Sequence, residues 1–314
     1  MELSFQLIEQ IFCLFLMGVA GFVLAKSGLV DGPSCRPVST ICVYIFVPCM
    51  IFGGFLIDWT HDRMVGMVVA FLAACVIHLV FLLAAELLRK PLGLSEIDCA
   101  SLAYTNAGNL LIPLIVGTLG EEYIFYCCSY MVAQNLLLWG WSAPRIGGQK
   151  GFRLDKLLKN PTIIAICLGF LFMLFPLRLP AAIVSTIKSV GNCMAPASMV
   201  MVGILMAGIK LSGSPQTKGS GKVMALRLGL FPFITLAVLL PLALFVDHPD
   251  IWQICFVYML AGSGPSASQV PQVAQLYGVD AERASYLNSV TTLLCSFTLP
   301  LASMLALWAL PGGV

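Results

Sequence analysis

Two apolar segments of the chain carry the same interruption, half the chain apart. In the first, small and amide residues (105–109) precede Pro113, and in the second, residues 263–269 precede Pro271. Pro113 and Pro271 are 158 positions apart, as are Gly120 and Gly278, in a chain of 314 residues. Proline lacks a backbone donor and clashes with the preceding helical turn, so it interrupts a helix. The pattern predicts two related halves, each with one broken helix.

The composition indicates that these helices lie in a membrane. Hydrophobic residues make up 59% of the chain and charged residues 10%, with a mean hydropathy of +0.95. A soluble domain carries roughly 25% charged residues. In lipid, irregular backbone is tolerated only where protein or a water-filled cavity satisfies it. Paired interrupted segments of this kind indicate the binding site of a secondary transporter.

The apolar runs predict an all-α polytopic membrane protein with ten transmembrane helices, since each span needs about 20 mostly apolar residues. The interruptions fall in the fourth and ninth runs, which are expected to form broken, crossed helices. The runs cover approximately residues 6–25, 38–57, 65–88, 97–118, 122–143, 160–176, 181–209, 223–246, 251–276 and 282–310.

Lysine and arginine indicate the orientation, because they concentrate in cytoplasmic connections. With the N-terminus outside, the outer connections hold only Arg63, Arg178 and Lys188 of the 17 basic residues. This distribution predicts that both termini lie outside and that the number of spans is even. The inner connections would hold the other 14, which are Lys26, Arg36, Arg89, Lys90, Arg145, Lys150, Arg153, Lys156, Lys159, Lys210, Lys218, Lys222, Arg227 and Arg283.

The ten spans divide into two sets of five. Residues 1–143 form the first predicted repeat, residues 144–159 a basic cytoplasmic linker, and residues 160–314 the second repeat. Because five is odd, the second set enters the membrane from the opposite side, so the repeats are predicted to be inverted. Pro48 and Pro196, 148 positions apart, are a second and looser correspondence.

Several short motifs, in order along nearly the whole chain, resemble the auxin efflux carrier family. The chain lacks the long hydrophilic central loop of many plant members and is more similar to the compact bacterial branch, which includes malonate and malate carriers. The motifs are Gly21–Leu29 (GFVLAKSGL), Tyr44–Pro48 (YIFVP), Asn106–Asn109 (NAGN) with Ile112–Pro113, Lys159–Ala165 (KNPTIIA), and the stretch from Ala284 through Ser289 to Leu299–Leu301 (LPL).

The resemblance implies more than the residues alone establish. It implies ten helices with crossed broken helices four and nine, and a small organic anion as substrate. It also implies a scaffold of helices one, two, six and seven, and a mobile transport domain formed by the others. A homodimer joined through the scaffold, in a bacterial inner membrane, is the expected assembly.

The predicted substrate site lies where the two broken helices cross. A broken helix exposes unpaired N–H groups that attract anions, and Pro113 and Pro271 are expected to mark the breaks. The alternative interpretation is that the nearby polar side chains only satisfy the broken backbone. The predicted substrate-binding residues are Asn106, Asn109, Pro113, Ser263, Ser266, Ser268, Gln269, Pro271 and Gln272. Predicted scaffold or lining residues are Tyr44, Pro48, Gln134, Asn135, Asn192 and Pro196.

Ionisable residues within the spans are few, with Glu9, His78 and Glu86 the main candidates. His78 lies deepest and is a candidate proton relay, although a buried, hydrogen-bonded histidine is the alternative. No acidic residue falls in either interruption, which disfavours a carboxylate-rich cation site. No lysine or arginine falls there either, so dipoles and neutral donors would have to attract an anion. No cofactor and no metal site are predicted.

The predicted function is secondary transport of a small mono- or dicarboxylate by alternating access. Two alternatives remain open, namely a sodium-coupled bile-acid-type carrier and a transporter-like sensor that binds without translocating. The chain lacks the paired acids or histidine clusters that a membrane-embedded enzyme would need, so no enzymatic activity is predicted. The expected partners are the carboxylate, the lipid bilayer, a second copy of the chain and a coupling proton or sodium ion, but no nucleic acid.

Overall fold

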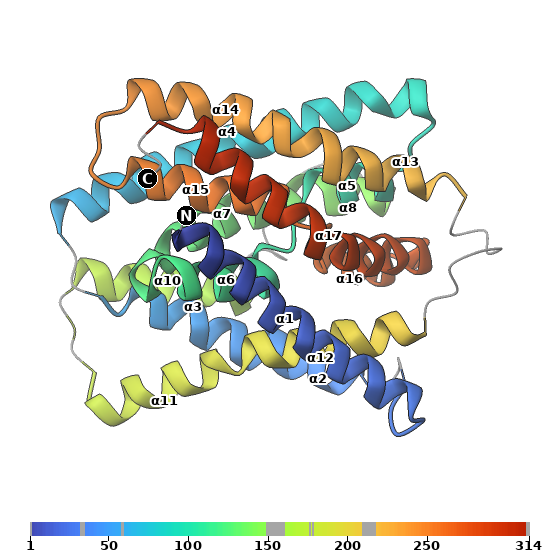
Figure 1. Cartoon of the computed structure of the whole chain (residues 1–314), viewed down its shortest axis with the longest axis horizontal. Coiled ribbons are helices and arrows are strands. Elements are labelled where there is room, and N and C mark those ends of the chain that lie inside the picture. Colours follow the sequence, from blue (N-terminus) through green and yellow to red (C-terminus); the bar gives the residue numbers. More distant parts are fainter. Residues whose placement is uncertain are drawn as a thin grey trace.

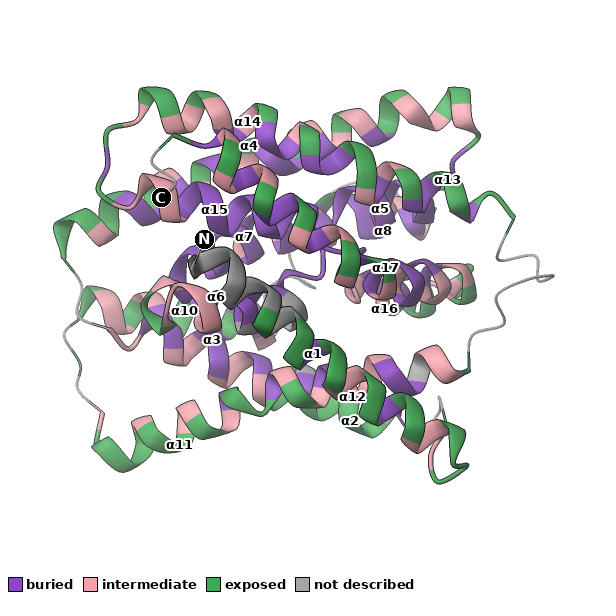
Figure 2. Cartoon of the chain, in the orientation of Figure 1, coloured by how far each residue is buried: buried purple, intermediate pink, exposed green. Residues whose placement is uncertain are grey.

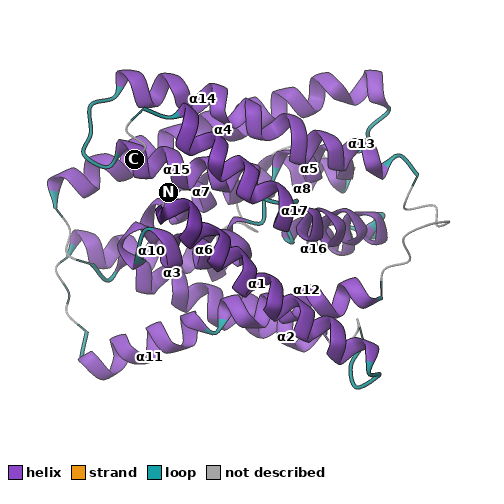
Figure 3. Cartoon of the chain, viewed as in Figure 1, coloured by secondary structure: helices purple, strands orange, loops and turns teal. Residues whose placement is uncertain are grey.

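The secondary structure is helical throughout the described residues, with no strand among them (Figure 3). The computed structural model describes residues 2–31, 35–57, 60–148, 161–175, 177, 179–208 and 218–311. The greater part of the predicted linker (149–159), including Lys150, Arg153, Lys156 and Lys159, lies outside these ranges, as do Arg178 and Lys210.

Within the described ranges, the helical segments group into ten runs that match the predicted spans to within several residues, which confirms an all-α polytopic membrane protein. The first five runs are α1 (Glu2–Lys26); α2 (Cys35–Ile41), η1 (Cys42–Phe46) and α3 (Val47–Phe55); α4 (His61–Leu92); α5 (Glu96–Ala103), η2 (Ala107–Leu111) and α6 (Ile112–Thr118); and η3 (Glu121–Tyr123), α7 (Ile124–Leu137), η4 (Leu138–Ser142) and α8 (Ala143–Ile146). The last five are α10 (Pro161–Leu174); α11 (Ala181–Asn192) and α12 (Met194–Ala207); α13 (Ser220–Ala225), η6 (Leu226–Leu230) and α14 (Phe231–Phe245); α15 (Ile251–Ser263) and α16 (Gln269–Leu276); and α17 (Ala281–Ala309).

Four of these helices are long and apolar enough to cross a membrane by length and composition, within the described residues. They are His61–Leu92, Ala181–Ile204, Ser220–Phe245 and Ala281–Ala309. Shorter apolar helices supply further spans, including Phe12–Lys26, Tyr44–Phe55, Pro161–Leu174 and Ile251–Ser263. The burial pattern agrees with a lipid environment, because α7 and α15 are largely buried while the outer faces of α4 and α14 expose apolar side chains (Figure 2).

The connections gather at two opposite ends of the helical bundle. Figure 1 shows the start of α1 and the end of α17 in the left half of the view, with the connection from α14 to α15, and the connection from α4 to α5 on the right. Polar contacts join neighbours at each end. At the end with the connection from α14 to α15, Tyr126 donates a hydrogen bond to Asp250 (2.7 Å), and at the end with the start of α5, Arg283 pairs with Asp98 (2.7 Å). Both chain ends on one side agree with an even number of spans.

The ion pair between Arg283 and Asp98 ties the start of α17 to the start of α5. The Asp98 side chain is 4% exposed and that of Arg283 14%. Asp98 also completes a capping box with Ser95 at the N-terminus of α5. Removing one partner of so buried a pair is costly, whereas exposed ion pairs contribute little to stability. This pair therefore holds the start of the fourth span, at α5, against the start of the tenth span, α17.

In the part of the chain that the structure describes, four segments of π-helix interrupt the α-helices, and each is followed by a proline. η1, η2, η4 and η6 end two residues before Pro48, Pro113, Pro144 and Pro232, respectively. A proline cannot donate to the preceding turn, and its ring clashes with the carbonyl oxygen four residues earlier. Widening that turn by one residue relieves both problems, which is how a π turn forms within a helix. The prolines therefore account for the positions of all four π turns.

The first and seventh spans pack with their backbones in contact. A Cβ atom on Gly203 of α12 would collide with the backbone of Gly18 and Phe22 on α1. A Cβ atom on Gly21 would likewise collide with the backbone of Val200. Small residues allow such close approach between membrane helices. Helices α1 and α12 therefore form a tight pair, visible at the lower right of Figure 1.

Candidate substrate site at the helix crossover

Each broken helix has a short non-helical gap, and the two gaps pair with each other. The first runs from the end of α5 at Ala103 to Ala107, and the second from the end of α15 at Ser263 to Gln269. Thr105 and Ser266 form an isolated antiparallel β-bridge. Around it, Asn106 N donates to Pro265 O (2.9 Å) and Ala267 N donates to Tyr104 O (3.0 Å). Each gap thus satisfies backbone groups that the other would leave unpaired in lipid.

The prediction that Pro113 and Pro271 mark the breaks is wrong. Pro113 is the second residue of α6, in a helical run that begins at Ala107, and Pro271 is the third residue of α16. Proline is tolerated in the first turn of a helix, where its missing N–H would have no acceptor, and the π turn of η2 accommodates Pro113. The chain instead leaves the helix at Tyr104 and Gly264, both in extended conformation.

The matching glycines do occupy equivalent backbone positions. Gly120 follows α6 with φ of 116°, and Gly278 follows α16 with φ of 65°. Side chains disfavour positive φ, so glycine suits both positions. The second half of each broken helix is therefore followed by a glycine with positive φ, at the offset of 158 residues seen in the sequence.

Gln134 of α7 pairs with the backbone of the first gap in the manner of a neighbouring strand. Its Oε1 accepts from Thr105 N (3.0 Å) and its Nε2 donates to Thr105 O (2.8 Å). The Thr105 hydroxyl also donates to Oε1 (3.2 Å). Gln134 is only 4% exposed. Its amide therefore replaces water for both backbone groups of Thr105.

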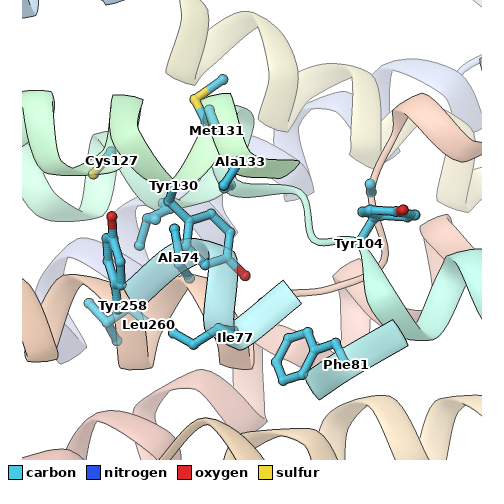
Figure 4. Close-up of a cluster of buried hydrophobic side chains, with 14 of the residues drawn as sticks. Ala74, Ile77, Phe81, Tyr104, Cys127, Tyr130, Met131, Ala133, Tyr258 and Leu260 are labelled. Carbon is cyan, nitrogen blue, oxygen red and sulfur yellow. The ribbon is translucent and has the colours of Figure 1, made fainter. Parts of the chain in front are cut away.

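His78 of α4 lies beside this pairing and is fully buried. Its Nδ1 lies 2.8 Å from the carbonyl oxygen of Ala74, so Nδ1 carries the proton. Its Nε2 lies 3.5 Å from Gln134 Oε1, and its ring centroid lies 4.5 Å from that of Tyr130. The surrounding cluster, in which Phe81, Tyr104, Tyr130 and Tyr258 are labelled, is shown in Figure 4. His78 of α4 therefore lies in contact with Gln134 beside the crossover, and its Nε2 can donate to Gln134 Oε1 only when both ring nitrogens are protonated.

The second gap contributes three further predicted residues. Ser266 Oγ donates to Ser101 O (2.8 Å) and is fully committed to the backbone of α5. Ser268 Oγ lies 3.5 Å from Asn106 Oδ1, and Gln269 Nε2 donates to Asn135 Oδ1 (3.1 Å). The structure therefore brings Asn106, Asn135, Ser266, Ser268 and Gln269 to one place.

Three buried side-chain atoms at the crossover, on Ser101, Ser263 and Gln269, remain without partners among the described residues. Ser263 Oγ and Gln269 Oε1 are buried and make no hydrogen bond there. Pro271 is buried beside them on α16 and Gln272 is partly exposed. The side chains of Asn109 and Pro113 lie outside the described residues. Ser263 and Gln269 thus keep hydrogen-bonding capacity that the fold does not use.

Of the six predicted scaffold or lining residues, Gln134 and Asn135 lie at the crossover and the other four do not. Tyr44 is 65% exposed, Asn192 and Pro196 are exposed, and Pro48 lies half-buried at the start of α3. Asn192 borders a cavity of about 220 Å³ that also includes Glu121 and Lys188. That cavity lies at the end of the bundle where Lys188 pairs with Glu121, away from the crossover.

Arg227 is the crossover residue that the sequence interpretation missed. It was assigned to an inner connection but lies fully buried in η6. It donates hydrogen bonds to the backbone oxygens of Leu102 (3.0 Å), Gly262 (2.7 Å) and Gly264 (3.0 Å). No lysine or arginine lies within either interruption, as expected, but the eighth span brings Arg227 to the crossover, so dipoles and neutral donors are not the only groups there. The available signal was Arg227 lying within the predicted span 223–246.

A cavity of about 260 Å³ lies between α1, α12 and α17. Its wall reaches the crossover through Cys295, whose Sγ lies 3.8 Å from Ser263 O. The lining is apolar except for Thr292, Ser296 and Cys295, and the other lining residues are Leu14, Phe15, Gly18, Val19, Phe22, Met199, Val202, Met206, Leu293 and Leu299.

An all-α bundle with broken helices meeting in its interior defines a polytopic membrane protein of the transporter type. A family model described as "membrane transport protein" matches residues 6–151 and 149–303. The chain belongs to this family, that of the auxin efflux carriers. It is therefore a membrane secondary transporter rather than an enzyme. No curated protein sequence matches the chain.

Proposed function

We propose that this protein carries a small organic anion, a mono- or dicarboxylate such as malonate or malate, by alternating access. The supporting observation is the paired gaps, which place the N-terminal ends of η2 and α16 at the crossover. The first N–H groups of a helix have no intrahelical acceptor and favour an anion. Among the described residues, the crossover hydrogen bonds involve no aspartate or glutamate that would repel one.

We assign substrate contacts to the polar groups with unused capacity. These are Ser263 and Gln269, together with Asn106 and Ser268, whose mutual contact is long at 3.5 Å. Asn109 remains a proposed contact on the strength of the sequence. The cavity beside Cys295 offers a route from α1 and α12 to these groups. Gln134 and Ser266 instead support the backbone, as their short bonds to it indicate.

Uptake into proteoliposomes from a panel of labelled organic acids is expected to show transport of at least one mono- or dicarboxylate. The acid should be displaced by other acids but not by the matched neutral amide, because the hydrogen bonds that a carboxylate accepts are charge-assisted and stronger than those to a neutral amide. Saturable binding without uptake would instead indicate a sensor. Equal competition by neutral or cationic analogues, or no uptake and no binding of any acid, would contradict the proposal.

The same assay identifies the coupling ion. We propose proton coupling through His78, because this buried imidazole contacts the glutamine that holds the first gap. An imposed proton gradient is then expected to accelerate uptake, whereas a sodium gradient is not. Acceleration by sodium alone would favour the bile-acid-type alternative and remove the role of His78.

We further propose that both termini lie outside a bacterial inner membrane and that the scaffold joins two copies in a homodimer. Removing Arg227 from the inner set leaves 13 basic residues on the predicted inner side, instead of 14, against three on the outer side. Single cysteines at the exposed positions Glu122 and Lys222, in a cysteine-depleted variant, test the orientation. An impermeant thiol reagent is expected to label position 122 and not position 222 in intact cells. The reverse pattern would show that the orientation is inverted.

A further inference from the structure

We propose that Arg227 supplies the net positive charge that makes the crossover select an anion. This inference rests on the proposed function and names the residue responsible for its charge preference. The guanidinium contacts the ends of both broken helices at once. Leu102 lies in the last turn of α5, while Gly262 and Gly264 lie at the end of α15.

Helix dipoles by themselves give little net attraction at a crossover. Each helix N-terminus carries about +0.5 and each C-terminus about −0.5 of an elementary charge. The crossover collects the C-termini of α5 and α15 and the N-termini of η2 and α16. These four partial charges sum to about zero. A pair of broken helices therefore offers donors to an anion but needs another charge to prefer it over a neutral molecule.

Arg227 changes this balance. Its three described bonds all end on carbonyl oxygens at the C-termini, so its charge offsets the two negative helix ends. Within the described residues it has no carboxylate partner, and its neighbours include the rings of Phe81 (5.3 Å) and Phe231 (5.5 Å). The positive charge at the N-termini of η2 and α16 is then no longer balanced by the negative charge at the C-termini of α5 and α15. A charge buried in a membrane span is costly and is retained where it has a function.

The local backbone places this side chain. Arg227 lies in the π turn of η6, which Pro232 follows. One residue corresponds to about 100° of rotation around a helix. Without the π turn, Arg227 and the residues before it would turn by up to that amount relative to α14, which would move the guanidinium away from the three carbonyls. Pro232 therefore acts as a positioning residue for Arg227.

The expected size of the effect follows from Coulomb's law. At an effective dielectric constant of about 20, a unit charge about 8 Å from a carboxylate changes binding by roughly 30-fold. A neutral substrate of the same shape should change far less. The contrast between acid and amide therefore separates an electrostatic role from a purely structural one, which would weaken both equally.

The test compares wild type with Arg227→Gln, using malonate, malate and their neutral amides as competitors of uptake and as ligands in detergent. Arg227→Gln is expected to weaken acid binding roughly 30-fold while changing amide binding less than about threefold. Lys222→Gln, an exposed residue of α13 in the same span, is the matched control and should leave both unchanged. Membrane abundance and thermal stability are measured in parallel.

Arg227→Lys keeps the positive charge but loses the planar guanidinium fork. It is therefore the test variant if Arg227→Gln fails to fold. It should be less stable than wild type yet keep the preference for acids. Retained acid preference in folded Arg227→Gln, or its loss in folded Arg227→Lys, would overturn the inference alone. Absence of acid binding by wild type would overturn the proposed function as well, so the two failures are distinguishable.

Discussion

Replacing Gln134 with alanine is expected to abolish transport while leaving the protein in the membrane. The substitution removes the partner of both Thr105 N and Thr105 O, which are buried. Each buried backbone group left unsatisfied costs about 1–3 kcal/mol. The first gap would then lose about 2–6 kcal/mol of its stability by the same measure. Uptake into proteoliposomes, normalised to reconstituted protein, gives the readout.

Two further variants test whether the loss of transport comes from the lost pairing between Gln134 and Thr105. Gln134→Glu retains an acceptor for Thr105 N but loses the donor to Thr105 O, so intermediate activity is expected. Gln275→Ala removes an exposed glutamine on α16 and is the matched control, with uptake equal to wild type. Normal uptake by Gln134→Ala would mean that its pairing with Thr105 does not hold the gap for transport.

Replacing Gly203 with leucine is expected to separate α1 from α12 and to destabilise the whole protein. The new Cβ atom would meet the backbone of Gly18 and Phe22, and a backbone cannot move aside as a flexible side chain can. Overpacking of this kind costs about 1–3 kcal/mol or more. The midpoint of thermal unfolding in detergent should fall by about 5 °C or more.

Gly221→Leu is the control for this substitution. A Cβ atom at Gly221 meets nothing within 4 Å, so the change in side-chain volume is the same without the collision. Its unfolding midpoint should stay within about 1–2 °C of wild type, as is usual for exposed sites. Equal midpoints of thermal unfolding for both variants would show that α1 and α12 do not pack closely at Gly203.

The spans were predictable from the sequence because apolar runs of membrane length leave few alternatives. The family was predictable because its motifs occur in order. The breaks were placed wrongly because proline was taken as their cause. The gaps at Tyr104 and Gly264 are instead fixed by pairing across a sequence separation of about 160 residues, which local rules do not include.

Arg227 was missed for a related reason. Positive charges in membrane proteins gather in cytoplasmic connections, so an arginine near a span end is assigned there by default. Its burial depends on three carbonyls supplied by two other spans. Gln134 was identified as a polar residue within a span, but nothing local distinguished contact with substrate from contact with the Thr105 backbone. Only the fold brings α7 to the first gap.

The π turns also bear on how the length of this chain can vary. A π turn contains one residue more than the α-helical turn it replaces. Deleting one residue within η1 or η4, together with replacing the following proline, would restore a regular helix while leaving the flanking faces in register. A deletion elsewhere in a span would rotate all later residues by about 100°. Related chains are therefore expected to differ by single-residue gaps at these turns more readily than at other points in their helices.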